Sequence, residues 1–267
     1  MISATTTPVF WEDPMRLTLC MMMLAVGAVH AQERIDLHFY VRPPYMVKNG
    51  EAQVSGLTAD PAQAAFDKAG VPFRWQQTPA KRQLVMIERG SGLDCGVGWY
   101  KTPERERFGK FTAPLYRDKP TAGIAHADFN VRSKTLAGIV ADPATRVVMK
   151  VGLTYGQEVV GIMVHAKTQV LTVATEQANL ARMVASGRAD FMFSTQEEVD
   201  ILRTDVDRGG GSLKVLTFQD LHAGGTRHIL CSRNVSDETI DKLNAALVEL
   251  AIPANARARS SPTIPRP

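Results

Sequence analysis

Strand-like and helix-like segments alternate twice along this chain, and the alternation restricts the fold more than any other feature of the sequence. The first series opens with RIDLHFYV and TADPAQAAFDKAG, and the second opens with RVVMKVG and YGQEVVGIMVHA. A polar stretch at residues 128–134 separates the two series. Alternating strands and helices are typical of an α/β fold in which helices cover a largely parallel sheet. The chain is therefore expected to form two α/β lobes in succession.

Local signals support individual elements of this pattern. Every second residue from Ile35 to Val41 is apolar, which predicts a strand with one buried face. In STQEEVDIL, Ser194 or Thr195 is followed three residues later by a glutamate, which is the spacing of a helix capping box. The segment SDETIDKLNAALVEL is amphipathic and has Ser236 as its expected cap.

Both ends of the chain differ from the segments between them. Met15 and Arg16 precede the apolar run LTLCMMMLAVGAV and the small residues of VHAQE, which predicts a secretory signal peptide at residues 1–31, with Met15 as a possible true start. The run is shorter than the roughly 20 residues that a membrane-spanning helix needs. The mature protein is therefore expected to be soluble in the periplasm. The Pro- and Arg-containing end, residues 251–267, is expected to be a disordered tail.

Composition and charge exclude several classes of function. The chain has 267 residues and 45% hydrophobic residues, enough to bury a sizeable core. Its net charge is +4, but the basic residues are scattered rather than interleaved with aromatics, which argues against a nucleic-acid partner. The six histidines lack metal-ligand spacing, and no glycine-rich phosphate loop is present. We therefore expect neither a metal nor a cofactor.

Two cysteines remain in the mature chain, and their state depends on export. An oxidising compartment would allow Cys95 and Cys231 to form a disulfide. The alternative is two separate buried thiols, since both residues lie in apolar, strand-like runs. Because a sequence cannot test bridge geometry, both alternatives stay open here.

The segment CGVGWYKTPERERF combines a buried strand with a charged turn. Cys95, Val97 and Trp99 alternate with glycines and predict a strand that ends before Pro103. Arg105 then falls at the carboxyl end of that strand. Ligands of open α/β sheets bind at this edge, so the segment predicts a binding site.

Several motifs occur in the order and spacing of one protein family. They are RPPYMVKNGEAQVSGLTADPAQA, GVGWYKTPERERFGKFTAPLY, KVGLTYG, SGRADFMF and TRHILCSRNVSDETIDKLNAALVEL. From Ile35 to Leu250 the chain resembles a family 3 periplasmic solute-binding protein, the receptor component of polar amino-acid ABC importers. The resemblance implies a two-lobed, type II periplasmic-binding-protein fold with a ligand cleft between the lobes. It places one lobe at residues 32–117 plus 226–250 and the other at 121–225.

The same resemblance implies that Arg105 binds a ligand carboxylate. A guanidinium presents a planar fork of donors that meets both carboxylate oxygens. The alternative is a solvated arginine paired with Glu104 or Glu106. In the second lobe, free N–H groups and the helix dipole around Thr154 and Tyr155 are expected to complete the anion site.

Further residues are implied as ligand-binding by their positions. They are Arg42, Tyr45, Gly98, Trp99, Tyr100 and Thr195. The aromatic residues among them are expected to form apolar walls of the pocket or ordinary core. Thr195 stands where the family usually has an aspartate for the ligand ammonium, and Arg42 stands where the family has an aromatic residue. Because these departures remove a negative charge and add a positive one, we expect carboxylates without an ammonium group, or acidic ligands, to be preferred.

These expectations combine into a binding protein rather than an enzyme. The chain is expected to be a monomeric receptor that captures a small carboxylate-bearing solute for an inner-membrane ABC permease complex. One alternative is a periplasmic dehydratase-like enzyme on the same fold, in which Glu197 or Glu198 serves as the acid. Another is a detached sensor domain.

Overall fold

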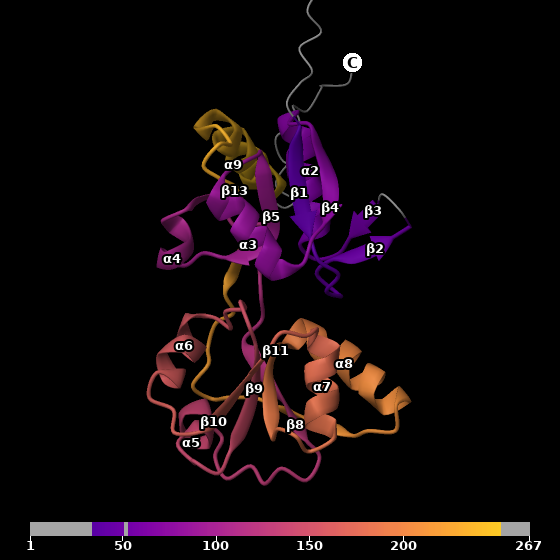
Figure 1. Cartoon of the computed structure of the whole chain (residues 1–267), viewed down its shortest axis with the longest axis vertical. Coiled ribbons are helices and arrows are strands. Elements are labelled where there is room, and N and C mark those ends of the chain that lie inside the picture. The colour runs from indigo at the N-terminus through magenta and orange to yellow at the C-terminus, as the bar shows by residue number, and fades with distance from the viewer. Residues whose placement is uncertain (1–33, 51–52, 252–267) are drawn as a thin grey trace, which may run out of the picture. The chain divides into compact units, whose positions relative to one another are not determined.

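A computed structural model describes residues 34–50 and 53–251 of the chain (Figure 1). The predicted signal peptide, residues 1–31, lies outside the described residues. So does the predicted tail, apart from Ala251, which is the last residue of helix α9. Within residues 34–50 and 53–251, no helix has both the length and the apolar character that crossing a bilayer requires.

The first lobe contains a six-stranded mixed sheet with the order β4-β1-β5-β13-β6, and β7 also pairs with β13. Strands β4 and β5 run parallel to β1, whereas β13 is antiparallel to β5. The strands are β1 (Ile35–Phe39), β4 (Phe73–Gln77), β5 (Asp94–Tyr100), β6 (Gly109–Phe111), β7 (Tyr116–Arg117) and β13 (Thr226–Ser232). Strands β2 (Val47–Asn49) and β3 (Gln53–Ser55) form a separate antiparallel pair.

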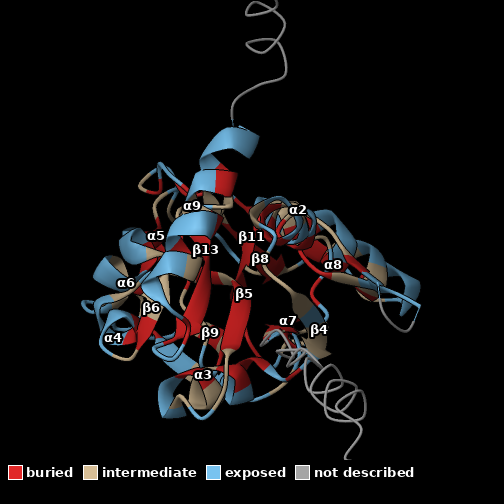
Figure 2. Cartoon of the chain, turned by 90° about the horizontal axis from the view of Figure 1, so that it is seen from above, coloured by how far each residue is buried: buried red, intermediate tan, exposed pale blue. Residues whose placement is uncertain are grey.

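Helices cover both faces of this first sheet. The contacting helices α2 (Ala59–Ala69) and α9 (Asp237–Ala251) share one core with β1, β5 and β13. Helix α3 (Ala80–Arg89) packs on the other face, and the short α4 (Pro103–Glu106) follows β5. Figure 2 shows β5 and β13 as buried strands beneath α9, whose outer side is exposed.

The second lobe contains a five-stranded sheet with the order β10-β9-β11-β8-β12. Its strands are β8 (Thr121–His126), β9 (Arg146–Lys150), β10 (Gln169–Val173), β11 (Phe191–Thr195) and β12 (Leu213–Leu216). Strand β9 is parallel to β10 and β11, and β8 is antiparallel to β11 and β12. The helices are α5 (Leu136–Val140), α6 (Gln157–Met163), α7 (Gln177–Ala185) and α8 (Gln196–Arg208).

Alternating residues of the second sheet serve two different cores. Met192 packs with residues of α7 and α8, whereas its neighbours Phe191 and Phe193 pack with residues of α5 and α6. This arrangement confirms the predicted α/β fold with helices on both faces of a sheet. The expectation of a largely parallel sheet was wrong, because β13 and β8 each pair antiparallel with their neighbours and make both sheets mixed. The strands of the first sheet lie within residues 32–117 and 226–250, and those of the second lie within residues 121–225. The exact limits of the lobes stay a prediction.

Two local expectations were wrong in detail. Strand β1 ends at Phe39, so Val41 lies beyond it and is 42% exposed. Thr195 occupies the N-cap of α8 but makes no side-chain capping bond, because its hydroxyl donates to the Glu198 carboxylate instead. The expected cap of α9 is present, since Ser236 accepts a hydrogen bond from the Thr239 amide at 3.1 Å.

A break in the pleat of β5 changes the direction of Trp99. Gly98 has a φ of +83°, and the register between β5 and β13 shifts at this point. Cys95 and Val97 therefore face the core under α2 and α9, whereas Trp99 belongs to the core under α3. Strict alternation in the sequence would have placed all three on one face.

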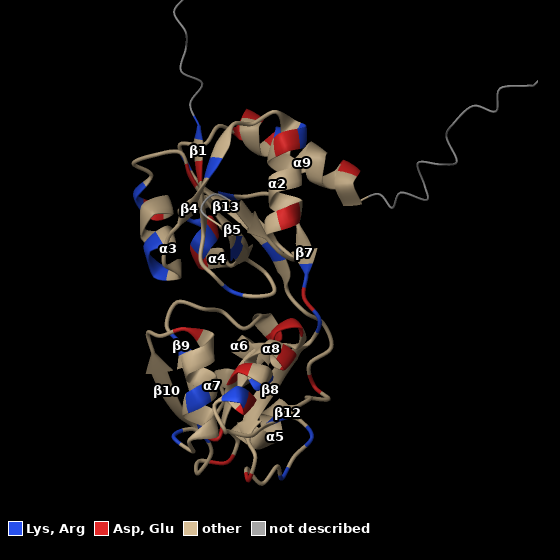
Figure 3. Cartoon of the chain, turned by 90° about the vertical axis from the view of Figure 1, so that its right-hand side faces the viewer, with Lys and Arg blue, Asp and Glu red and all other residues tan. Residues whose placement is uncertain are grey.

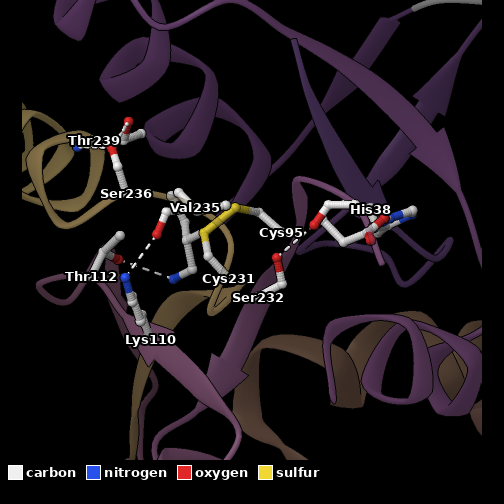
Figure 4. The surroundings of a disulfide bond; sticks show 12 residues. His38, Cys95, Lys110, Thr112, Cys231, Ser232, Val235, Ser236 and Thr239 are labelled. Carbon is white, nitrogen blue, oxygen red and sulfur yellow. Dashed lines mark hydrogen bonds and ion pairs between the residues drawn. A yellow bond between two sulfur atoms is a disulfide. The ribbon is translucent and has the colours of Figure 1, made fainter. Parts of the chain in front are cut away.

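The structure joins the two remaining cysteines. Cys95 and Cys231 are directly opposite each other in the antiparallel pair β5–β13, and their sulfur atoms form a disulfide (Figure 4). Both residues are fully buried. The bond therefore lies inside the first lobe and links its two central strands.

Candidate functional site

Arg105 is a buried cation at the end of β5. Thr102 caps α4 by accepting from the Arg105 amide at 3.3 Å, and Pro103 starts the helix, so this turn fixes the position of Arg105. The Arg105 side chain is 6% exposed, and its guanidinium lies 4.7 Å from the ring centre of Trp99. The interpretation as a solvated arginine is therefore wrong.

The hydrogen bonds of Arg105 go to neutral backbone groups. Nη1 donates to the Tyr100 carbonyl at 2.8 Å, and Nη2 donates to the Gly152 carbonyl of the other lobe at 3.5 Å. Among the described residues, no carboxylate forms an ion pair with Arg105. Burial lowers the pKa of Arg105, because removal from water disfavours the charged guanidinium, and the charge of the nearby Glu104 only partly offsets this effect.

Arg42 and Glu198 form a bidentate ion pair between the lobes. Arg42 Nε donates to Glu198 Oε1 at 2.6 Å, and Nη2 donates to Oε2 at 2.8 Å. Both side chains are buried, with exposures of 9% and 2%. Thr195 and Tyr40 complete the group, because the Thr195 hydroxyl donates to Glu198 at 3.0 Å and Arg42 donates to the Tyr40 hydroxyl at 3.1 Å.

The ionisation of Glu198 follows from these contacts. Burial alone would raise the pKa of its carboxyl group, but Arg42 and the Thr195 hydroxyl hold that pKa below its usual value. Glu198 is therefore a carboxylate at neutral pH, and the pair with Arg42 carries no net charge.

A second buried ion pair lies between Arg227 and Asp118. Arg227 Nε and Nη2 each lie 2.8 Å from an oxygen of Asp118, and Nη1 donates to the Gly98 carbonyl at 3.0 Å. Tyr100 and Tyr45 also bind Asp118 through their hydroxyl groups. Their rings lie 4.7 and 4.0 Å from the Arg227 guanidinium, so this arginine is held between two aromatic rings.

Glu197 binds three neutral donors from the first lobe and the crossing that follows it. Its carboxylate accepts from the Tyr116 hydroxyl at 3.0 Å and the Lys119 amide at 2.8 Å. The Tyr45 hydroxyl lies 3.3 Å away and shares its single proton between Glu197 and Asp118. Burial, followed by the Tyr116 hydrogen bond to Glu197, raises the pKa of Tyr116 to about 12. Figure 3 shows acidic positions on α8 in red.

Two polar residues lie at the carboxyl end of the second sheet. Lys150, at the end of β9, donates to Glu176 at 2.8 Å and lies 5.5 Å from the ring centre of Tyr40. Gln177 begins α7 and is 6% exposed, yet neither polar atom of its amide has a hydrogen-bond partner. Buried polar groups of this kind are uncommon in folded proteins.

Two cavities flank these ion pairs. One of about 350 Å³ is lined by residues that include Tyr100, Thr154 and Tyr155. Another of about 670 Å³ has the Arg42–Glu198 pair in its wall and apolar lining from Val41, Pro43, Ile201 and Leu202. Cavities of this size fit small molecules.

The structure gives Tyr155 a contact that the sequence does not indicate. Helix α6 starts at Gln157, two residues later than the sequence suggests, and Gly156 is its N-cap. The Tyr155 hydroxyl accepts from the Lys150 amide at 2.9 Å, and the Tyr155 carbonyl accepts from the Thr121 hydroxyl at 3.2 Å. Tyr155 therefore holds the loop between β9 and α6, while Thr154 faces the cavity beside it.

The expected ligand-binding residues form one connected region. Arg42, Tyr45, Tyr100 and Thr195 belong to the ion-pair and hydrogen-bond groups described above, and Arg105 joins them through the Tyr100 carbonyl. Trp99 and Gly98 each make one further hydrogen bond. The Trp99 indole donates to Gln83 at 3.2 Å, and the Gly98 carbonyl accepts from Arg227.

Asp118 and Arg227 are central to this region, but neither is among the residues expected from the sequence to bind a ligand. Asp118 follows β7 directly, at the first crossing between the lobes. Arg227 is a charged residue inside the otherwise buried strand TRHILCS. That single cation in a buried strand is the signal that points to a paired acid.

Comparison with known proteins connects this geometry with a family. Residues 40–251 match the family described as "Bacterial extracellular solute-binding proteins, family 3". The chain belongs to this family. No curated protein sequence matches the chain.

Solved structures of other solute-binding proteins share the fold of this family 3 protein. "An ancestral arginine-binding protein bound to arginine" has a TM-score of 0.66 and 19% identity, over 82% of this chain and 92% of that one. The holo arginine-binding protein from T. maritima has a TM-score of 0.65 and 16% identity, over 85% and 94% of the two chains. An ancestral amino acid-binding protein, described as a precursor of cyclohexadienyl dehydratase, has a TM-score of 0.61 and 19% identity, over 82% and 89%.

Proposed function

We propose that this protein is an exported receptor that captures a small carboxylate-bearing solute for an ABC importer. The observation that carries the proposal is Arg105: a buried guanidinium stacked on Trp99, with hydrogen bonds only to backbone carbonyls. A buried cation without an anionic partner is costly unless a ligand supplies the anion. A carboxylate meets the planar fork of a guanidinium through two parallel hydrogen bonds, a geometry that phosphate shares.

Contacts of Arg105 also suggest how the solute is enclosed. Its guanidinium already reaches the Gly152 carbonyl in the second lobe. A carboxylate bound to Arg105 would therefore lie next to both lobes. A ligand that contacts both lobes stabilises their closed arrangement, which is how a receptor of this fold reports its load to a permease.

A binding role accounts for the acidic residues better than catalysis does. A dehydratase-like enzyme needs a protonated acid near the substrate. The pKa of Glu198 is held below its usual value, and Glu197 already accepts three hydrogen bonds. Glu198 is therefore not a proton donor at neutral pH. The alternative of a detached sensor domain finds no specific support among the described residues.

Native mass spectrometry of the protein isolated from the periplasm tests the proposal. We expect a small carboxylic acid to copurify and to be lost on unfolding, and we expect N-terminal sequencing to find Gln32 as the first residue. Recovery of the full-length chain in the cytoplasm would contradict export. Copurification of a ligand without any carboxylate would contradict the assignment of Arg105.

A further inference from the structure

Trp99 lies beside a fully buried glutamine of α3. Gln83 has no exposed surface, and Trp99 is 4% exposed. The Trp99 indole N–H donates to Gln83 Oε1 at 3.2 Å, and Gln83 Nε2 donates to the Thr78 carbonyl at 2.7 Å. An indole nitrogen only donates and a carbonyl only accepts, so these two partners fix the direction of the Gln83 amide.

The loop that binds Gln83 is itself fixed to the first sheet. The Thr78 amide donates to the Phe39 carbonyl at 2.8 Å, and the Thr78 hydroxyl lies 2.9 Å from His38 Nδ1. His38 Nε2 lies 2.8 Å from an oxygen of Asp94, the first residue of β5. Thr78, His38 and Asp94 are all buried. Buried polar groups that satisfy one another in this way are rigid, so Gln83 is anchored rather than free to rotate.

Gly96 leaves the space that the contact between Trp99 and Gln83 needs. A Cβ at Gly96 would lie 2.5 Å from Trp99 Nε1 and 2.9 Å from Gln83 Oε1. Packed atoms do not approach so closely, so a larger residue would push the indole away from the amide. The two glycines of CGVGW therefore have different roles. Gly98 turns Trp99 toward α3, and Gly96 lets its nitrogen reach Gln83.

Trp99 in turn contacts Arg105. The guanidinium of Arg105 lies over the indole ring, 4.7 Å from its centre, and its remaining contacts are the Tyr100 and Gly152 carbonyls. An aromatic face stabilises a cation that has lost its water. Rotation of the indole would withdraw that face from the guanidinium. The hydrogen bond to Gln83 opposes this rotation, because a rotated indole would leave its buried N–H without a partner.

We infer that Gln83 is a positioning residue of the carboxylate site. Its hydrogen bond fixes the ring of Trp99, and the ring fixes the guanidinium of Arg105. The inference rests on the proposed function, in which Arg105 binds the carboxylate of the solute.

Nuclear magnetic resonance of the unliganded protein tests this positioning. The indole N–H of Trp99 should exchange with solvent more slowly than that of Trp75, whose hydrogen bond to Gln63 is exposed and 3.5 Å long. The ring current of Trp99 should shift the Arg105 Nε–H resonance upfield, and Gln83→Leu should reduce that shift. Gln63→Leu removes the matched bond at Trp75 and should leave the Arg105 resonance unchanged. Fast exchange of the Trp99 indole, or an unchanged Arg105 resonance in Gln83→Leu, overturns the inference.

Calorimetric titration measures the effect on recognition, with 4-methylpentanoate and 4-methylpentanamide as probes. Gln83→Leu should weaken binding of the acid by about three- to tenfold, the scale of one neutral hydrogen bond. It should weaken the amide less, because the amide brings no charge to Arg105. A merely structural role of Gln83 would lower the melting temperature and leave the ratio of the two affinities unchanged, which would contradict the inference.

A double-mutant cycle tests whether Gln83 acts through the indole. Trp99→Phe keeps an aromatic ring but lacks the N–H, so adding Gln83→Leu to it should not change the acid-to-amide ratio further. A further change would show that Gln83 acts by another route and would overturn the inference. Gly96→Ala separates the indole from the amide without altering either residue and should behave like Gln83→Leu. The test therefore does not depend on one variant that fails to fold.

Arg105→Lys separates failure of this inference from failure of the proposed function. If Arg105→Lys weakens the acid while Gln83→Leu keeps the wild-type ratio of acid to amide, the receptor function stands and the role of Gln83 falls. If the wild type does not bind the acid at millimolar concentration, or if Arg105→Lys has no effect, the proposed function itself fails and this inference falls with it.

Discussion

Arg105 and Arg42 are both buried, but of the two only Arg42 forms an ion pair with a carboxylate among the described residues. Arg42 has a carboxylate partner 156 residues away in the sequence, whereas Arg105 contacts two backbone carbonyls and the face of Trp99. The position of Arg105 at the end of β5 can be predicted from local sequence, because Thr102 and Pro103 form a helix start around it. The Arg42–Glu198 pair is not predictable in this way, since it depends on how two distant segments meet.

Replacing Arg105 with lysine tests the role of the guanidinium fork. Arg105→Lys keeps the charge but loses bidentate geometry, so carboxylate binding should weaken by about 1.5–3 kcal/mol, the scale of a charge-assisted hydrogen bond. Isothermal titration calorimetry measures the change. Arg107→Lys, at an exposed neighbouring position, is the matched control and should bind like the wild type. Equal affinity of both variants would refute the assignment.

The pair between Arg42 and Glu198 should also make stability depend on pH. The folded pKa of Glu198 lies below its ordinary value of 4.5, so the carboxylate stabilises the fold above that pH and ceases to do so as pH falls through the folded pKa. At pH 7, Glu198→Gln should lower the free energy of unfolding by roughly 3–5 kcal/mol, because it leaves Arg42 buried and unpaired.

Urea unfolding at several pH values measures this contribution. The difference between wild type and Glu198→Gln should be constant above about pH 5 and shrink below the ordinary pKa of glutamate. Glu88→Gln, at an exposed position of α3, is the control and should differ little from wild type at any pH. A difference that stays constant down to pH 3 would show that Glu198 does not titrate as described.

Single elements could be predicted where local chemistry decides them. The alternation of strands and helices follows the apolar periodicity of the sequence, and Ser236 caps α9 as expected. The bulge at Gly98 could not be predicted from periodicity, because alternation continues through it in the sequence. The disulfide likewise depends on the register of β5 against β13, which the sequence does not fix by itself.

Gly98 should resist substitution because of its backbone conformation. Its φ of +83° is unfavourable for any residue with a Cβ, so Gly98→Ala should destabilise the fold by roughly 1–2 kcal/mol. A Cβ there would meet the Thr58 hydroxyl at 3.4 Å, an ordinary contact, so the cost is conformational rather than steric. Gly161→Ala, inside α6 with open space around it, should be neutral or slightly stabilising. Denaturant unfolding of both variants decides the point, and equal stability would contradict the described bulge.

The disulfide should contribute measurably to the stability of the first lobe. It closes a loop of 136 residues, and removing it through Cys95→Ala/Cys231→Ala should cost about 2–5 kcal/mol of unfolding free energy. Chemical denaturation with and without dithiothreitol measures the effect. The reductant should destabilise the wild type and leave the double variant unchanged. If the wild type is also insensitive to the reductant, the two thiols are not paired in solution.

At the scale of the whole molecule, contacts between the lobes come from residues that are far apart in the sequence. Arg42 binds Glu198, Tyr116 binds Glu197, and Arg105 reaches Gly152. The order of strands along the chain is sufficient to predict two α/β units. The return of β13 to the first sheet, after the second sheet is complete, was predictable only from resemblance to a family, because strand patterns do not specify which sheet a strand joins.

The central claim is that this receptor recognises its solute through a carboxylate. Calorimetric titration of the mature protein with 4-methylpentanoate and with 4-methylpentanamide tests the claim most directly, since the two molecules differ only in the charged group. We expect the acid to bind and the amide to bind at least roughly tenfold more weakly, because the amide brings no charge to Arg105. Equal affinity for the acid and the amide would contradict the account.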